Sequence, residues 1–360
     1  MTERRLPGGL RMPAREPVPP PGGGRGTAPA GRRDARGRAV LRLLGSQRVL
    51  ILGVLACLFA GFGLASPSSF LSSFNLVNLL ASAAIMLILA TGETFVLISA
   101  GVDLSVGSVL VFSGVVAAEV MVHYGGAGAG WGAIGLGVLA GVLSGLAWGL
   151  INGALTAWAR IPSLIVTLGT LGASLGLAEV MTDGNDISAI PTRLVNSIGI
   201  GTIAGIPVFV IIAAVIVVTA IGLLNLTVFG RHTQAIGANS ESAYRAGINV
   251  RRHLLKIYAY QGLLAGIAGV LSLARFTNTT ISGHLSDNLA AITAVVVGGT
   301  SLFGGYGTVF GTLIGAFIPV VLLNGLVIVN LNAFWQQVVI GIILVVAVYA
   351  DQLRRSRPAP

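Results

Sequence analysis

Charged side chains are scarce in this 360-residue chain, at 9% of residues, whereas a soluble domain carries about 25%. Hydrophobic residues make up 54%, and the mean hydropathy is +0.88. A soluble protein of this composition would lack the polar side chains that cover a surface. The scarcity of charge therefore excludes an ordinary soluble fold.

Cysteine occurs once, as Cys57, which excludes an intrachain disulfide and a metal site built from paired thiolates. The sequence contains no Gly-x-x-x-x-Gly-Lys-[Ser/Thr] segment, so it has no P-loop for ATP. It also contains no His-Glu-x-x-His pair, and its few histidines are scattered along the chain. We therefore expect no catalytic residue, no metal site and no cofactor bound by this chain, and a membrane enzyme is disfavoured.

Long apolar, glycine-rich stretches of about 20 residues fill the rest of the chain. A bilayer core of about 30 Å needs about 20 helical residues at about 1.5 Å each. The pattern predicts an all-α, polytopic membrane protein whose membrane-spanning body covers residues 49–352. About ten transmembrane helices are expected, at 49–65, 75–98, 103–122, 131–159, 162–181, 206–227, 255–275, 288–303, 307–329 and 334–351, the eighth being short and open to interruption at Gly298-Gly299.

The placement of the basic residues predicts the orientation of these helices. Eleven of the 22 Lys and Arg residues precede residue 49, and most others lie in the 228–254 segment and at the C-terminus. Only Arg193 and Arg275 would lie outside if the N-terminus is inside, which satisfies the positive-inside rule with both termini cytoplasmic. The net charge of +10 thus reports topology, and no nucleic-acid partner is expected.

The two ends of the chain are expected to be tails. Residues 1–48 are rich in Pro, Gly and Arg, which predicts a disordered basic cytoplasmic tail, and residues 353–360 form a second cytoplasmic tail. A cleaved leader covering residues 1–66 is the alternative, but that length would be unusual, so a retained first helix is favoured.

Two polar segments interrupt the apolar body, at about 182–205 on the outer side and 228–254 on the inner side. In the inner segment, Asn239 or Ser240 is placed to cap a short helix, with Glu241 in its first turn and Gly247 at its end. A short amphipathic helix on the cytoplasmic face is a docking shape, although an ordinary connecting loop is the simpler interpretation.

A few polar residues fall within the predicted membrane region. Glu93 is expected to face the bundle interior, either in a structural hydrogen bond or on a translocation path. Asp103 is expected to cap the helix that begins near Ser105, and bordering the path is the alternative. Asn152 and Thr167 are expected to bond between helices, with substrate contact as the second interpretation.

Glycines recur every four residues in the fourth predicted helix and therefore share one of its faces. Such a face allows two helices to approach closely without any ligand. The glycines concerned are Gly137, Gly141, Gly145 and Gly149.

Four segments resemble the ribose-type sugar permeases, which are membrane subunits of bacterial ATP-binding-cassette importers. They are residues 91–108 (TGETFVLISAGVDLSVGS), residues 161–170 (IPSLIVTLGT), the 228–254 segment with Tyr258 and 262–266 (GLLAG), and residues 297–305 (VGGTSLFGG) followed by 334–337 (FWQQ). The resemblance runs from about residue 75 to residue 352.

The resemblance implies a type II importer-like permease of the bacterial cytoplasmic membrane that works beside a second permease chain, identical or not. A cytoplasmic ATPase, which holds the ATP and Mg²⁺, would dock on the inner loop, and an extracytoplasmic binding protein would deliver a sugar. The implied coupling residues are Gly237, Ala238, Asn239, Ala243, Arg245 and Gly247. We expect Gly237→Asp or Ala243→Asp to abolish uptake while membrane insertion stays intact.

The chain departs from this family at a few positions, which leaves the sugar unnamed. Asn288 stands where a Glu is frequent, Tyr306 where a basic residue is common, and Glu93 where Met or Gln is expected. Asn288 is accordingly added to the candidate path residues Glu93, Asp103, Asn152 and Thr167. Nucleosides or branched-chain amino acids are alternative cargoes, and an ion-coupled secondary transporter is the alternative from another class.

Overall fold

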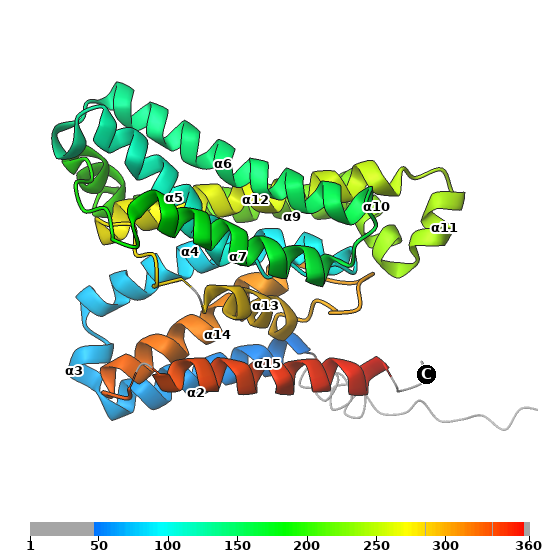
Figure 1. Ribbon diagram of the computed structural model, residues 1–360. Helices are drawn as coiled ribbons and strands as arrows, with labels where there is room; N and C mark the ends of the chain where they lie inside the picture. The colour runs from blue at the N-terminus through cyan, green and yellow to red at the C-terminus, as the bar shows by residue number, and fades with distance from the viewer. Residues whose placement is uncertain (1–46, 285, 333, 356–360) are drawn as a thin grey trace, which may run out of the picture. The chain divides into compact units, whose positions relative to one another are not determined.

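The computed structural model describes residues 47–284, 286–332 and 334–355, which belong to one compact unit. Figure 1 shows its long helices running side by side. The tail predicted for residues 1–48 lies outside the described residues except for its last two positions, which begin the first described helix. The predicted C-terminal tail begins inside a helix that continues to Arg355, and 356–360 lie outside the described residues.

Each predicted span coincides with a helix in the described part of the chain. The helices are α2 (Gln47–Ala65), α4 (Ser73–Ile98), α5 (Val106–His123), α6 (Trp131–Ala157), α7 (Ser163–Thr182), α9 (Val208–Leu226), α12 (Val250–Phe276), α13 (Asp287–Val297), α14 (Val309–Ile328) and α15 (Phe334–Arg355). Seven of them are long and apolar enough to cross a membrane, whereas α2, α13 and α15 carry shorter apolar stretches.

The ends of these helices follow ordinary capping chemistry. The Ser72 side chain accepts a hydrogen bond from the Asn75 N–H at the start of α4, and Thr308 accepts one from the Gly311 N–H at the start of α14. Proline directly precedes α7 and α9, where its fixed φ suits the approach to a helix. The starts of these four helices are therefore encoded locally.

The centre of the unit is formed by α4 and α12, which are buried on nearly all sides. An all-round apolar helix such as α4 is expected at the middle of a bundle. By contrast, α6, α7 and α9 each bury one face and leave apolar side chains such as Leu143, Leu168 and Val218 exposed. These outward apolar faces match contact with lipid tails.

Four of the connections between the long helices contain short elements of their own. The outer segment at 182–205 holds the short helical pieces α8 (Thr192–Leu194) and η2 (Val195–Gly199) and a two-stranded hairpin of β1 (Thr202–Ile203) with β2 (Ile206–Pro207). Shorter connections hold α3 (Pro67–Phe70) and η1 (Gly126–Gly128). The predicted inner loop is almost entirely helical, with α10 (Val228–Ala238), α11 (Ser240–Arg245) and the first residues of α12.

The eighth predicted span ends early, as the sequence allowed. Helix α13 stops at Val297, and Gly299 adopts a φ of +95°, a left-handed conformation that favours glycine. With 11 residues, α13 is about 16 Å long, which is too short to cross a bilayer core. The chain then returns through residues 298–308 to the start of α14.

Candidate functional site

Helices α10 and α11 project from one end of the bundle (Figure 1). The Asn239 side chain caps α11 by accepting a hydrogen bond from the Ser242 N–H at 2.8 Å, and Gly247 follows at a φ of +87°. Both features confirm the predicted local structure. Arg245 forms an ion pair with Glu241 one turn earlier, at 3.1 Å.

Burial divides the six predicted coupling residues. Four of them are exposed: Ala238, Asn239, Arg245 and Gly247. Ala243 is only 4% exposed and lies on the buried face of α11. A Cβ on Gly237 would lie 1.7 Å from the Ile98 carbonyl oxygen and 2.6 Å from the Gly305 nitrogen. Asp at Gly237 or Ala243 would therefore disturb packing, so the expectation that these variants leave the protein intact is not supported by the structure.

Sequence reasoning missed an exposed aromatic side chain on this surface. Tyr244, the last residue but one of α11, is 68% exposed. Tyrosine is enriched where one protein packs into another. The available signal was an aromatic residue in an otherwise polar inner segment.

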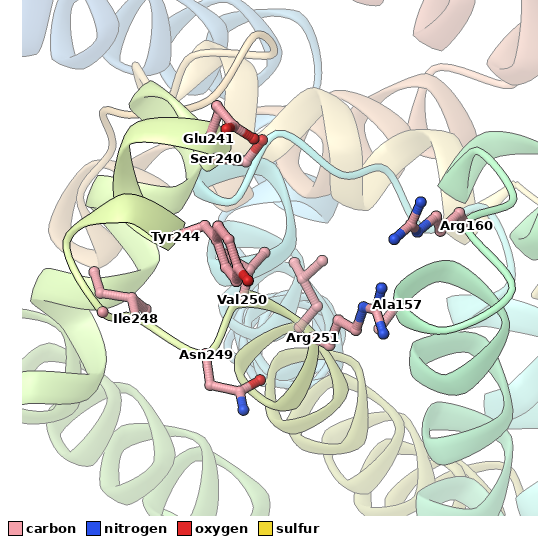
Figure 2. Close-up of a pocket in the computed structure, with 11 residues that line it drawn as sticks. Ala157, Arg160, Ser240, Glu241, Tyr244, Ile248, Asn249, Val250 and Arg251 are labelled. Carbon is pink, nitrogen blue, oxygen red and sulfur yellow. The ribbon is translucent and has the colours of Figure 1, made fainter.

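A basic hollow lies between α11, the end of α6 and the start of α12. It encloses about 910 Å³ and includes Tyr244, Asn249 and Glu241 in its lining. Figure 2 shows Arg160 and Arg251 at this hollow, the first from the connection after α6 and the second from the start of α12. Among the described side chains neither arginine forms an ion pair, so the hollow presents positive charge to whatever docks there.

Four of the five predicted path residues lie in one buried polar cluster, between the end of α4 and the starts of α5 and α7. Glu93 is 0% exposed, and its carboxylate accepts hydrogen bonds from the Asp103 N–H at 3.1 Å and from Gln261 Nε2 at 3.4 Å. The expected interior placement of Glu93 is confirmed. The carboxylate also joins α4 to α12, which is a structural role.

The sequence predicted that Asp103 caps α5, but in the structure it does not. The cap position is Ser105, which makes no capping bond with its side chain. Asp103 instead accepts from the Ser105 N–H at 2.8 Å and from its hydroxyl at 2.6 Å, a local turn two residues long. The prediction missed that the connection between α4 and α5 is largely buried. Backbone N–H groups in this connection need partners of their own, and Asp103 supplies one.

The remaining members of the cluster tie three more elements together. Asn152 of α6 donates to the Ser105 hydroxyl at 2.9 Å and accepts from the Thr170 hydroxyl at 2.7 Å. Thr167 of α7 donates to the Val102 carbonyl at 3.3 Å and to that of Ser163 at 2.9 Å. The sequence favoured bonding between helices for both residues. The geometry supports this for Asn152, which joins α6 to α7. Thr167 instead bonds α7 to the connection between α4 and α5.

Asn288, the fifth predicted path residue, belongs to α13. Its side-chain oxygen accepts a hydrogen bond from the Gly107 N–H at 2.5 Å, at the start of α5. A Cβ at Gly107 would lie 2.8 Å from that oxygen, so glycine is required for this close approach. Asn288 therefore joins α13 to the start of α5.

A polar cavity lies at the end of the bundle opposite α11. It encloses about 560 Å³ between α4, the end of α12, the start of α13, the end of α14 and the start of α15. Its polar lining consists of Ser82, Arg275, His284, Asp287, Asn324 and Gln336. Arg275 and the first residue of α12, beside α11, are about 37 Å apart along the helix at about 1.5 Å per residue.

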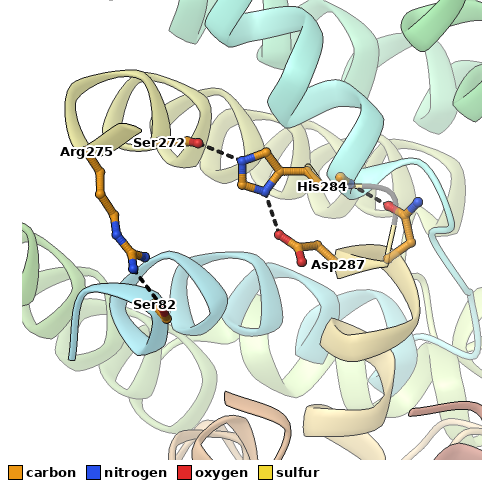
Figure 3. A network of polar contacts seen from close by, with 7 residues as sticks. Ser82, Ser272, Arg275, His284 and Asp287 are labelled. Atoms are coloured by element: carbon orange, nitrogen blue, oxygen red, sulfur yellow. Dashed lines mark hydrogen bonds and ion pairs between the residues drawn. The ribbon is translucent and has the colours of Figure 1, made fainter. Parts of the chain in front are cut away.

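Two groups of hydrogen-bonded residues lie at this cavity, as Figure 3 shows. Arg275 donates from Nη2 to the Asn78 carbonyl at 3.2 Å and to the Ser82 hydroxyl at 2.9 Å, which ties α12 to α4. His284 bonds to the Ser272 hydroxyl through Nε2 and to Asp287 through Nδ1, each at 2.7 Å.

The order Ser272–His284–Asp287 has the connectivity of a hydrolase triad. Ser272 is only 3% exposed within α12 and is not part of the cavity lining, so no substrate reaches its hydroxyl in this structure. The three residues connect α12 to the start of α13 and do not form a nucleophilic site.

The sequence did not reveal this cavity because its residues come from five elements. Arg275 carried the clearest signal, as one of two basic residues expected on the outer side. His284 and Asp287 are three residues apart at the start of a helix, a spacing that brings their side chains together but says nothing about the arginine.

Comparison with known proteins identifies the family of this helical membrane protein. Residues 75–348 match the family described as "Branched-chain amino acid transport system / permease component". The chain belongs to this family, and its apolar helices make it a multi-pass protein of the bacterial cytoplasmic membrane, as predicted. No solved structure matches the chain.

Several curated relatives are named as sugar permeases. The ribose import permease protein RbsC of Bacillus subtilis (strain 168) is 39% identical over 289 residues, which cover 80% of this chain and 88% of that protein. The D-allose transport system permease protein AlsC of Escherichia coli (strain K12) is 35% identical over 300 residues, covering 83% and 90%. The fructose import permease protein FrcC of Rhizobium meliloti is 34% identical over 316 residues, covering 86% and 84%. The predicted resemblance is confirmed.

Proposed function

We propose that this chain is the membrane-spanning permease subunit of an ATP-driven importer that carries a monosaccharide or related polyol. The observation that carries the proposal is the likeness, over most of the chain, to permeases named for ribose, allose and fructose. The cargo alternatives, nucleosides and branched-chain amino acids, have no such support among these relatives. A polar cavity at one end and a docking surface at the other suit a conduit driven from one side.

The energy source would be a cytoplasmic ATPase, because the sequence has no P-loop. This partner would hold the ATP and Mg²⁺ and would dock on α10 and α11. Tyr244 supplies an exposed aromatic anchor, and Arg160 and Arg251 attract acidic side chains of the partner.

Movement of the docking surface has a direct route into the bundle. Gly237 at the end of α10 packs on the Ile98 carbonyl at the end of α4, and that same carbonyl accepts a hydrogen bond from the Gly305 N–H at 2.8 Å. A shift of α10 would therefore act at once on the central helix and on the 298–308 segment. Alternating access would follow if this junction has two packed arrangements.

An extracytoplasmic sugar-binding protein would deliver cargo to the end that holds the polar cavity. A second permease chain, identical or not, would pair with this one within the lipid bilayer. The apolar surfaces of α6, α7, α9 and α15 offer the area for lipid and for that partner.

Reconstitution tests the proposal. The chain, an ATPase and a sugar-binding protein encoded beside its gene are placed in vesicles, and uptake of D-ribose, D-allose and D-fructose is measured. We expect uptake of one or more sugars that requires both ATP and the ATPase. Sugar uptake by the chain alone under a proton or sodium gradient would instead support the ion-coupled alternative.

A further inference from the structure

The cavity opposite α11 contains a cation and an anion that do not pair with each other. Arg275 uses one of its three nitrogens, Nη2, for its bonds to α4. Asp287 Oδ2 is hydrogen-bonded to His284 Nδ1. Among the described residues no ion pair within 4.0 Å joins Arg275 to Asp287, although both line the same cavity of about 560 Å³.

We propose that this cavity is a station for a neutral sugar in transit, held by hydroxyl bonds to Arg275 and Asp287. The inference rests on the proposed function and assigns the residues that touch the cargo. A sugar hydroxyl both donates and accepts, so one hydroxyl accepts from the guanidinium while another donates to the carboxylate. Charge-assisted bonds of this kind are about twice as strong as neutral ones.

The balance of charge identifies the class of cargo. Arg275 and Asp287 carry opposite charges, His284 is already bonded to the Asp287 carboxylate, and the remaining polar groups of the lining, Ser82, Asn324 and Gln336, are uncharged. An acidic sugar would meet the Asp287 carboxylate, and an amino sugar would meet the guanidinium, so a neutral polyol fits without leaving a charge unpaired.

The volume and the apolar walls of the cavity suit weak, reversible binding of a sugar. The cavity volume lies within the range of small-molecule pockets, about 300–1,000 Å³. Its walls include Ile85, Met86 and Leu323, which pack against C–H groups and offer no hydrogen bond. A transport site of this kind binds well enough to orient the cargo and weakly enough to release it inward.

The test uses the complete importer in vesicles, with sugar uptake and ATP hydrolysis measured in the same sample. The variants are Asp287→Asn, which keeps the size of the side chain, and Arg275→Gln, which removes the charge and shortens the side chain but leaves a polar amide. Arg193→Gln is the matched control, since Arg193 is an exposed arginine that does not line the cavity. Gel filtration of each purified complex checks that it is assembled.

We expect each cavity variant to lower uptake by about tenfold or more, the effect of one lost charged hydrogen bond. Hydrolysis stimulated by the binding protein stays within about twofold of wild type, because the docking surfaces are unchanged. Arg193→Gln matches wild type in both measurements.

Three results would overturn the inference while the proposed function stands. Unchanged uptake in both variants would remove the cavity from the path. A parallel loss of uptake and hydrolysis, or of assembly, would show that these residues hold the complex together or receive the binding protein. Normal uptake in Asp287→Asn alone would show that the Asp287 carboxylate does not hold the sugar. Failure of the proposed function is distinct, since the wild-type importer would then move no sugar with ATP.

Discussion

At the scale of single residues, Glu93 shows how a buried acid can be structural in a transport protein. It lies fully buried in α4 and accepts hydrogen bonds from the Asp103 backbone and from Gln261. The Gln261 side-chain oxygen has no hydrogen-bond partner among the described residues. The amide can therefore rotate and present that oxygen to a neutral side chain at position 93.

We predict that Glu93→Gln retains uptake within about twofold, because both bonds can be re-formed after that rotation. Glu93→Leu is the matched variant, and it should lower stability by about 1–2 kcal/mol for each interhelical bond lost. Uptake per inserted chain and thermal unfolding of the purified protein provide the two readouts. Abolished uptake in a stable Glu93→Gln protein would return Glu93 to the translocation path.

How far the sequence predicts the site can be judged from these residues. Burial of Glu93 and interhelical bonding of Asn152 follow from polarity within an apolar run, since such groups must find partners. The convergence of Arg275 with Asp287 does not follow, because it depends on how α12 and α13 pack. The burial of Ala243 was equally hidden, since a six-residue helix carries too little periodicity to show its inner face.

At the scale of elements, α6 and α12 form the most extensive contact between described helices, and glycines on both sides allow the two helices to approach closely. A Cβ on Gly145 would lie 2.5 Å from the Gly262 carbonyl oxygen, and one on Gly149 would lie 2.3 Å from that of Tyr258. Sequence alone predicted the α6 face correctly because a four-residue period fixes a helix face. It did not identify the partner helix.

We predict that Gly149→Ala separates α6 from α12 and lowers the melting temperature. Overpacking of a tight interface costs about 1–3 kcal/mol. Gly135→Ala on the same helix is the control, because a Cβ there meets nothing within 4 Å and alanine favours helix by up to about 1 kcal/mol. The idea fails if both variants melt alike.

The docking element gives a second prediction at this scale. Tyr244→Ala should lower ATP-driven uptake by about tenfold or more while insertion is normal, as for an interface hot spot. The control is Tyr124→Ala, a tyrosine 59% exposed at the other end of the bundle. Ala243→Asp should differ from both by failing to accumulate, because it buries a charge. Wild-type uptake in Tyr244→Ala would place the ATPase contact elsewhere.

At the scale of the whole molecule, the positions and order of the described apolar helices could be predicted because most of the apolar runs match the bilayer thickness. The exceptions are informative. Helix α13 is too short to span, and the partly buried connections 99–105 and 298–308 lie against each other, with the Gly305 N–H bonded to the carbonyl of Ile98 at the end of α4. Irregular backbone inside a membrane protein is tolerated only where protein surrounds it, and hydropathy cannot show that.

The two ends of the bundle must face opposite sides of the membrane for the whole account to hold. The α10–α11 end should meet the cytoplasm, and the segment at 182–205 should lie outside. The chain has a single cysteine, Cys57, so a Cys57→Ser background permits labelling at one chosen place. Tyr244→Cys and Asn185→Cys, both at exposed positions, report on the two ends.

The measurement is labelling by a membrane-impermeant maleimide in intact and in opened spheroplasts. Asn185→Cys should react in both, and Tyr244→Cys should react only after opening and should be protected when the ATPase is co-expressed. Reaction of Tyr244→Cys in intact spheroplasts would place the docking surface outside and contradict the account.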